Sequence, residues 1–262
     1  MFFDCPKSYH FSYLDPVYSR MKNELRNQPE NIWKFYTLGK AVHDAITLFY
    51  YSPPSQRTEK QLKEHLKETW RSEVMWNIKP PLGKWGGFSS IEEERETYRE
   101  ALLMLKNFFK MAAIEPEIKY LPTDDFRQSI NDYHDLIKPL SQDFDISGKF
   151  DLIIKNKDDS LHIIDFKTGK REGNDDFQLK FYKILAEENF KKPVKKISFY
   201  FLKTGNKKES DLKKGETEII KKEILKKINQ IETADNFEPK PSGLCQFCLF
   251  KKFCPQKKRN TS

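Results

Sequence analysis

A chain of 262 residues is long enough for one large domain or two small ones with a sizeable core. Hydrophobic residues make up 37% of the chain and aromatic residues 14%, so we expect a core rich in Phe and Tyr. No apolar run approaches the about 20 residues of a membrane span and the N-terminus lacks a signal-peptide pattern, which excludes a membrane protein and predicts a cytoplasmic one. The net charge of +8 suits a polyanionic partner such as nucleic acid, although many Lys-rich proteins bind none.

Apolar periodicity and turn residues predict helices and strands along most of the chain. In chain order, we expect helices over 32–51, 58–77 and 91–113, strands over 115–121, 126–130, 144–155 and 161–167, a helix over 175–190, a strand over 194–204 and a helix over 216–234. Ser89 or Ser90 caps the helix at 91–113, because Glu93 stands three residues after Ser90 in capping-box spacing. No Gly-Lys pair is followed by Ser or Thr, so any helicase motor would be a separate protein.

The strand-like run "LHIIDFKTGK" ends in an acid and a base two positions apart, Asp165 and Lys167. A strand alternates faces with period two, so both side chains point the same way. The preceding run, "GKFDLIIKNKDDS", leads into a polar turn centred near Asp158. If the hairpin is symmetric about Asp158, Asp151 lies directly opposite Asp165, with Cβ atoms about 5 Å apart.

Two facing carboxylates repel each other unless something neutralises them. A divalent cation does so, and carboxylate oxygens are ligands that Mg²⁺ or Mn²⁺ prefers. The alternative is that Asp151 and Asp165 are turn-flanking acids neutralised by Lys149 and Lys167. A slip of one residue in the register would also remove the alignment. These residues alone leave both interpretations open.

The order of motifs resembles the nuclease domains of the RecB-like branch of the PD-(D/E)XK superfamily. "G-x-x-D" is followed by "IIDFKTGK" and then by "QLKFY", which supplies Gln178 and Tyr182 on one helix face. "LGKAVHDAI" matches the family's Gly-x-x-x-His helix with Gly39 and His43. Family members often carry a Glu before the hairpin, for which Glu117 is the best match.

The resemblance implies a role for each matched residue. His43, Asp151 and Asp165 would hold Mg²⁺ or Mn²⁺, with the main-chain carbonyl of Phe166 completing the coordination. Such a cation binds the scissile phosphate and lowers the pKa of an attacking water. Lys167 would position that water or stabilise charge developing on the phosphate. Gln178 and Tyr182 would contact the DNA backbone or orient the site.

Three of the four cysteines stand in "GLCQFCLFKKFCP", as Cys245, Cys248 and Cys254, and the fourth is Cys5. In a cytoplasmic protein these thiols should not pair as structural disulfides. Four thiols are the number that a 4Fe–4S cluster or a zinc ion requires, so spacing alone leaves both open. The layout resembles iron–sulfur RecB-like nucleases, which include AddB-type helicase–nuclease subunits and CRISPR-associated exonucleases, and this resemblance favours the cluster.

The resemblance also implies an α/β fold with a restriction-endonuclease-like core, in which helices flank a mixed central sheet. A single nuclease domain, 1–262, would comprise a core (32–51 and 115–238), a helical insertion (52–114) and a cysteine-closed iron–sulfur lid (1–16 and 239–262). The implied function is a DNA nuclease, foremost an exonuclease on single-stranded ends, in DNA repair, recombination or CRISPR spacer acquisition. A helicase or a CRISPR-adaptation protein would be its partner. Two rivals remain open: a nuclease-fold protein that binds DNA without cutting it, and a zinc-stapled interaction module.

Overall fold

The computed structural model describes residues 1–70, 82–122, 136–169, 176–212 and 217–256. These residues form two compact units, one made of Met1–Trp33 with Leu225–Ser262 and the other of Lys34–Ile224. The α-helices are α1 Pro6–Tyr9, α2 Pro16–Arg26, α3 Lys34–Tyr51, α4 Glu59–Trp70, α6 Ile91–Met111, α7 Asp176–Phe190 and α8 Thr217–Glu232. The strands are β1 Ile118–Tyr120, β2 Leu136–Pro139, β3 Asp145–Gly148, β4 Leu152–Lys155, β5 Leu161–Lys167, β6 Val194–Phe201 and β7 Asn206–Asp211.

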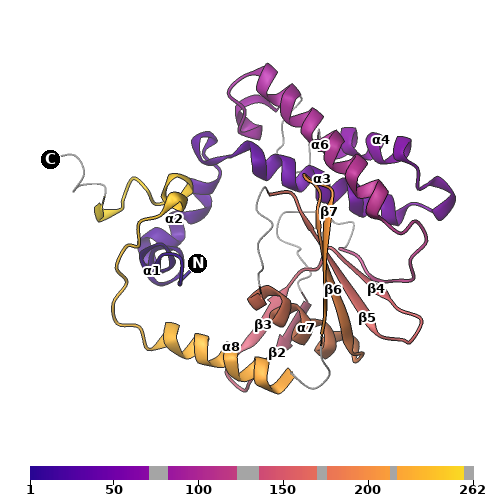
Figure 1. Cartoon of the computed structure of the whole chain (residues 1–262). Coiled ribbons are helices and arrows are strands. Elements are labelled where there is room, and N and C mark those ends of the chain that lie inside the picture. Colours follow the sequence, from indigo (N-terminus) through magenta and orange to yellow (C-terminus); the bar gives the residue numbers. More distant parts are fainter. Residues whose placement is uncertain (71–81, 123–135, 170–175, 213–216, 257–262) are drawn as a thin grey trace. The chain divides into compact units, whose positions relative to one another are not determined.

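The larger unit is built on a mixed five-stranded sheet (Figure 1). Its strand order is β1-β4-β5-β6-β7. The pairing of β5 with β6 is parallel and the other three pairings are antiparallel. A separate two-stranded sheet pairs β2 with β3. The predicted α/β fold with a mixed central sheet flanked by helices is therefore confirmed.

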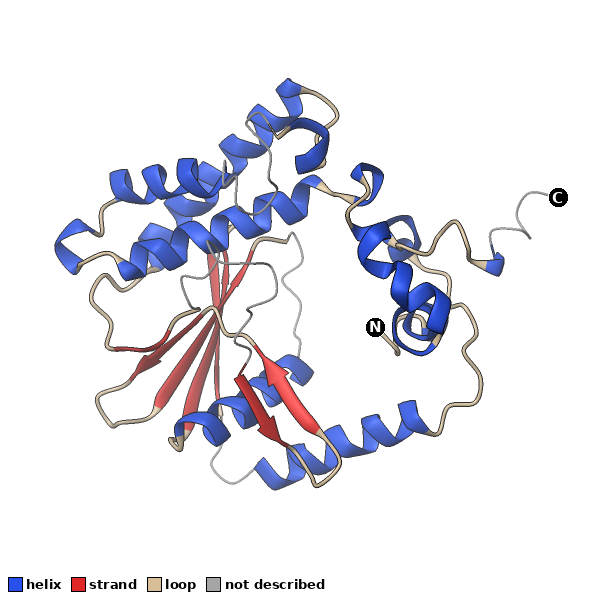
Figure 2. Cartoon of the chain, turned by 180° about the vertical axis from the view of Figure 1, so that it is seen from behind, coloured by secondary structure: helices blue, strands red, loops and turns tan. Residues whose placement is uncertain are grey.

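Helices cover both faces of the five-stranded sheet (Figures 1 and 2). Residues of α3, α4 and α6 form one core with the even-numbered strand residues, such as Leu152, Ile164 and Phe166. The odd-numbered residues of β5 point to the opposite face, where α7 lies. Asp165 is one of these odd-numbered residues, so its side chain faces α7 rather than the core under α3.

Helix α6 begins where the capping pattern predicts. Ser90 accepts a hydrogen bond from the amide of Glu93 at 3.2 Å, which satisfies one of the free amides of the first turn. The Glu93 carboxylate in turn accepts from the amide and hydroxyl of Ser89. Ser90 is thus the N-cap of α6, and the Glu93 side chain bonds to the preceding Ser89 in place of the N-cap amide of a regular capping box.

Several predicted strands differ from those observed. The strand expected over 144–155 is two strands, because β3 pairs with β2 in the small sheet and β4 pairs with β1 and β5 in the large one. The run 194–204 stops at Phe201, where a turn leads into β7, a polar edge strand that has no apolar alternation to predict it. The strand expected over 126–130 lies outside the described residues, as do 71–77 of the second predicted helix.

The smaller unit brings both ends of the chain together. Its core consists of Phe11, Leu25 and Phe250, and the rings of Phe11 and Phe250 lie 5.5 Å apart. Lys240 also donates a hydrogen bond to the carbonyl of Phe3 at 2.9 Å. Aromatic packing between residues near the two termini therefore holds this unit together.

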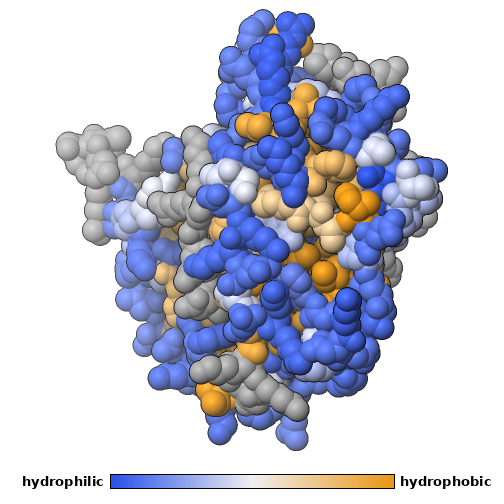
Figure 3. All heavy atoms as spheres, turned by 45° about the vertical axis from the view of Figure 1, so that its right-hand side comes forward, coloured by the Kyte–Doolittle hydropathy of each residue, from blue (hydrophilic) through white to orange (hydrophobic). Residues whose placement is uncertain are grey.

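The surface agrees with a composition that is 33% charged. On the face drawn in Figure 3, hydrophilic residues predominate and apolar residues emerge in smaller groups between them. Among the described residues, none of the helices combines the length and apolar character needed to span a bilayer.

Candidate active site

The β4–β5 hairpin places Asp151 and Asp165 side by side. Leu152 pairs with Ile164 and Lys155 with Leu161, so the hairpin is symmetric about Asp158 and the predicted register is the observed one. Asp158 holds the turn, since its carboxylate accepts from both the amide and the hydroxyl of Ser160. One step beyond the ladder, Asp151 stands opposite Asp165.

Asp151 is held by two donors from different elements. Its Oδ1 lies 3.0 Å from Nδ1 of His43 on α3, and its Oδ2 accepts from the amide of Phe166 at 2.7 Å. Burial acts to raise the pKa of Asp151, but the charge of His43 and these hydrogen bonds outweigh it and lower that pKa below its ordinary value. Burial acts to lower the pKa of His43, and Asp151 reverses this effect and raises it. Each group thus favours the charged form of the other.

Asp165 is the centre of a second network, formed with Lys167 and α7. Lys167 Nζ lies 2.8 Å from Asp165 Oδ2 and donates to Gln178 Oε1 at 2.8 Å. The Gln178 amide and the Tyr182 hydroxyl converge on Asp165 Oδ1, at 3.3 and 3.2 Å. Gln178 and Tyr182 stand one helical turn apart, so a single face of α7 supplies both contacts.

Asp165 is buried, with 5% of its surface exposed. Burial, and then the neighbouring charge of Asp151, raise the pKa of Asp165 to about 6. Its Oδ2 has no hydrogen-bond donor of proper geometry among the described residues, and its contact with Lys167 is ionic in character. The positive charge of Lys167 therefore lies directly against this buried carboxylate and opposes the rise of its pKa.

Gly39 brings α3 close to the end of β5. A Cβ atom added at Gly39 would lie 3.2 Å from the hydroxyl oxygen of Thr168, which directly follows Lys167. Glycine therefore lets the helix approach the residue after Asp-x-Lys without a steric clash. Sequence reasoning matched Gly39 to a motif but missed Thr168, whose only signal is a hydroxyl residue directly after the Asp-x-Lys pair.

Glu117 does not join these residues, so its match to the family's glutamate is wrong. Its carboxylate pairs with Lys155, and its carbonyl accepts from the amide of Lys155. Lys155 lies at the end of β4 remote from Asp151. Of the alternative in which Lys149 and Lys167 neutralise the two acids, the pairing of Lys167 with Asp165 is observed. Asp151 contacts His43 and the Phe166 amide.

Comparison with known proteins assigns a family. The family model described as the PD-(D/E)XK nuclease superfamily matches residues 1–255, nearly the whole chain. The chain belongs to the PD-(D/E)XK nuclease superfamily. No curated protein matches it. Membership in this superfamily implies that the chain is a nuclease, which is a hydrolase, and that its substrate is DNA.

PD-(D/E)XK nucleases typically use Mg²⁺ or Mn²⁺, and the donor set at the end of β5 suits such an ion. It combines one imidazole, from His43, and the two carboxylates of Asp151 and Asp165, and carboxylate oxygens are ligands that these ions prefer. Among the described residues, however, no three or more His, Cys, Asp or Glu side chains are grouped as metal ligands are. His43 and Asp151 contact each other directly through Nδ1 and Oδ1.

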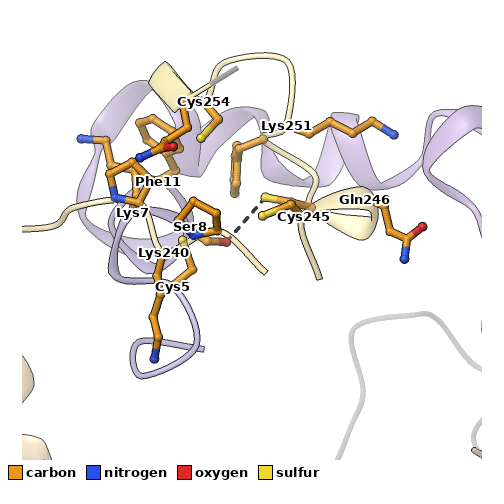
Figure 4. Close-up of a pocket in the computed structure, with 14 residues that line it drawn as sticks. Cys5, Lys7, Ser8, Phe11, Lys240, Cys245, Gln246, Lys251 and Cys254 are labelled. Atoms are coloured by element: carbon orange, nitrogen blue, oxygen red, sulfur yellow. Dashed lines mark hydrogen bonds between the residues drawn. The ribbon is translucent and has the colours of Figure 1, made fainter. Parts of the chain in front are cut away.

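The four cysteines line one cavity in the smaller unit (Figure 4). The cavity has a volume of about 380 Å³, and Phe11 and Phe250 form part of its wall. Burial raises the pKa of the Cys248 thiol, whose sulfur lies 3.9 Å from the Ser8 hydroxyl. In the described part of the chain, these cysteines are not grouped as metal ligands are either.

Proposed function

We propose that the chain is a metal-dependent deoxyribonuclease, acting foremost as an exonuclease on single-stranded DNA ends. One observation carries the proposal: the buried Asp165 stands beside Asp151 and shares its strand face with Lys167, whose ammonium lies 2.8 Å from the Asp165 carboxylate. This is the arrangement of acid, acid and base that a PD-(D/E)XK nuclease uses. DNA repair, recombination or CRISPR spacer acquisition, with a helicase or CRISPR-adaptation partner, are the pathways that fit such an activity.

In this proposal, some site residues bind the metal ion and another, Lys167, acts on the phosphate or the attacking water. His43, Asp151 and Asp165, with the carbonyl of Phe166, would hold the Mg²⁺ or Mn²⁺ ion, which supplies an activated water and neutralises phosphate charge when bound. Lys167 has its ammonium at the exposed side of Asp165, where it serves the phosphate or the attacking water.

Gln178 and Tyr182 act as positioning residues in this scheme. Gln178 accepts from Lys167 and donates to Asp165, so it fixes the relative placement of the acid and the base. The Tyr182 hydroxyl donates to the same Asp165 oxygen. The expected role for these two residues is therefore orientation of the site rather than contact with the DNA backbone.

End-labelled single-stranded and duplex DNA, incubated with Mg²⁺ or Mn²⁺, tests this proposal. The wild-type protein should shorten single-stranded substrates, and Asp165→Asn should lose cleavage by at least about 100-fold, because the variant removes one charged ligand while keeping the side-chain volume. Asp211→Asn, which changes an exposed acid on β7, is the matched control and should cut as the wild type does.

Equal cutting by wild type and Asp165→Asn at matched purity would refute the assignment. DNA binding by the wild type without cleavage under any divalent cation would instead favour the rival, a nuclease-fold DNA-binding protein. Cleavage of duplex ends in preference to single strands would keep the nuclease and reject the single-strand preference.

We also propose that Cys5, Cys245, Cys248 and Cys254 hold a 4Fe–4S cluster with a structural role. The support for this cluster is that all four cysteines line one cavity. Lys7, Lys240 and Lys251 also line this cavity and add positive charge to it. Thiolate ligands suit both iron–sulfur clusters and zinc. Anaerobically purified protein should absorb near ~400 nm and contain iron, whereas Zn²⁺ is d¹⁰ and colourless. Colourless protein with stoichiometric zinc would favour the zinc-stapled module.

A further inference from the structure

Helix α3 leaves one narrow stripe uncovered along its length. Most of its residues are buried beneath α4 and α6 or against the sheet. Along the helix from Thr37 to Tyr50, the residues that are not buried are Gly39, Lys40, His43 and Asp44. These four stand three and four positions apart, so they form one face. Among the described residues, the part of α3 next to the candidate site is therefore a partly exposed stripe.

Tyr36 stands at the start of this line. It precedes His43 by seven residues, which places the two side chains on nearly the same face and about 10.5 Å apart along the axis. The Tyr36 side chain is 58% exposed, more than the other exposed aromatic residues of α3, which are Phe35 at 42% and Tyr51 at 46%. The ring of Phe35 lies 4.8 Å from that of Tyr36, so the two form an exposed aromatic pair.

The stripe between Tyr36 and His43 carries small or polar residues. Gly39 contributes no side chain, and the hydroxyl of Thr168 stands next to it. Lys40 supplies positive charge, partly offset by its ion pair with Asp44 at 2.5 Å. A chain of nucleotides could lie along this stripe with its backbone near Lys40 and its reacting phosphate near His43, which leaves a base beside Tyr36.

We propose that Tyr36, supported by Phe35, is a stacking platform for an unpaired base of single-stranded DNA that enters the site along α3. The inference rests on the proposed nuclease function and names its substrate class. Exposed aromatic rings on which bases stack are one means by which proteins hold single strands without reading sequence. Bases inside a duplex are stacked on each other and cannot use the ring, so the platform selects unpaired DNA.

The test measures binding in the Asp165→Asn background without divalent cation, using a fluorescently labelled oligo-dT strand. Adding Tyr36→Ala should weaken binding by about 5- to 150-fold, the range for loss of one base–aromatic stack. Tyr36→Trp should bind at least as tightly as the parent, because stacking uses the ring face. Tyr13→Ala is the matched control, since Tyr13 is 55% exposed, and it should bind as the parent does.

An abasic scan along the strand supplies the decisive comparison. In the parent protein, one abasic position should weaken binding as much as Tyr36→Ala does, and that position should have no further effect in the Tyr36→Ala protein. Blunt duplex binding should not respond to Tyr36→Ala. Equal binding by Tyr36→Ala and parent, or additive effects at every abasic position, would overturn the platform.

The platform and the nuclease proposal fail in different ways. If wild-type protein cuts single strands while Tyr36→Ala binds and cuts equally well, the platform is wrong and the nuclease stands. If wild-type protein cuts nothing with Mg²⁺ or Mn²⁺, the nuclease proposal fails. The binding measurement, made without cation, still decides the platform in that case.

Discussion

His162 is a buried imidazole on the core face of β5, three residues before Asp165. Its Nε2 lies 2.7 Å from the Ser198 hydroxyl, which donates to Glu209 on the edge strand β7. Burial first, and then the charges of Lys196 and Lys207, lower the pKa of His162 to about 4, although Glu209 opposes them. The neutral form of His162 is therefore part of the native sheet.

We predict that His162 makes the protein sensitive to acid. Its folded-state pKa lies below the unfolded value of 6.5, so the unfolded chain binds a proton more readily between about pH 6.5 and 4. Stability should be lost as the pH falls through this window, by about 2 to 3 kcal/mol at pH 4. Urea unfolding of wild type and His162→Gln, measured from pH 7.5 to 4, gives the difference between their free energies of unfolding at each pH. A difference that does not change with pH would contradict the role of His162.

Sequence reasoning located the candidate site because its residues obey local rules. Asp165 and Lys167 share a strand face, and Gln178 and Tyr182 share a helix face, so period two and period 3.6 place each pair. The contact of His43 with Asp151 depends on how α3 packs over the sheet, which no local rule gives. The Glu117 match failed for the same reason, because its partner lies at the far end of β4.

At the scale of secondary-structure elements, Gly39 controls how closely α3 approaches the end of β5. We predict that Gly39→Ala lowers cleavage while changing stability little. Alanine favours the helix by about 1 kcal/mol, but its Cβ would crowd the Thr168 hydroxyl and shift α3, with His43, away from Asp151. The double variant Gly39→Ala/Thr168→Ala removes the crowding atom and should recover cleavage. Cleavage and melting temperature of both variants check this, and full activity of Gly39→Ala alone would contradict it.

The sequence predicted elements well where the apolar pattern is continuous and poorly where it is not. The hairpin register followed from its polar turn at Asp158, and the start of α6 followed from Ser90. The break between β3 and β4 was missed because "ISGKFDLII" reads as one apolar-rich run, while the pairing of β3 with β2 is set by tertiary contacts. Strand β7 was missed because it is a charged edge strand.

At the scale of the whole molecule, the two ends of the chain depend on each other. We predict that Cys5→Ala releases the proposed cluster, because three thiolates hold it poorly, and lowers the melting temperature. Iron content and colour should fall and protease sensitivity should rise near both termini, whereas Asp165→Asn should keep its iron. Wild-type iron content and stability in Cys5→Ala would show that Cys5 is not a ligand.

The central claim is that Asp151 and Asp165 together bind a divalent cation, and melting with and without Mn²⁺ tests it most directly. Without Mn²⁺, Asp151→Asn should be less stable than wild type, because it loses the charge interaction with His43, and the lowered pKa of Asp151 shows that its favourable contacts outweigh the costs of its charged form. Saturating Mn²⁺, at about 100 times its Kd, stabilises the native state by about 2.7 kcal/mol. Wild type and the control Asp211→Asn should therefore melt several degrees higher, and Asp151→Asn should gain much less. Equal Mn²⁺-induced shifts in wild type and Asp151→Asn would place the ion elsewhere and contradict the account.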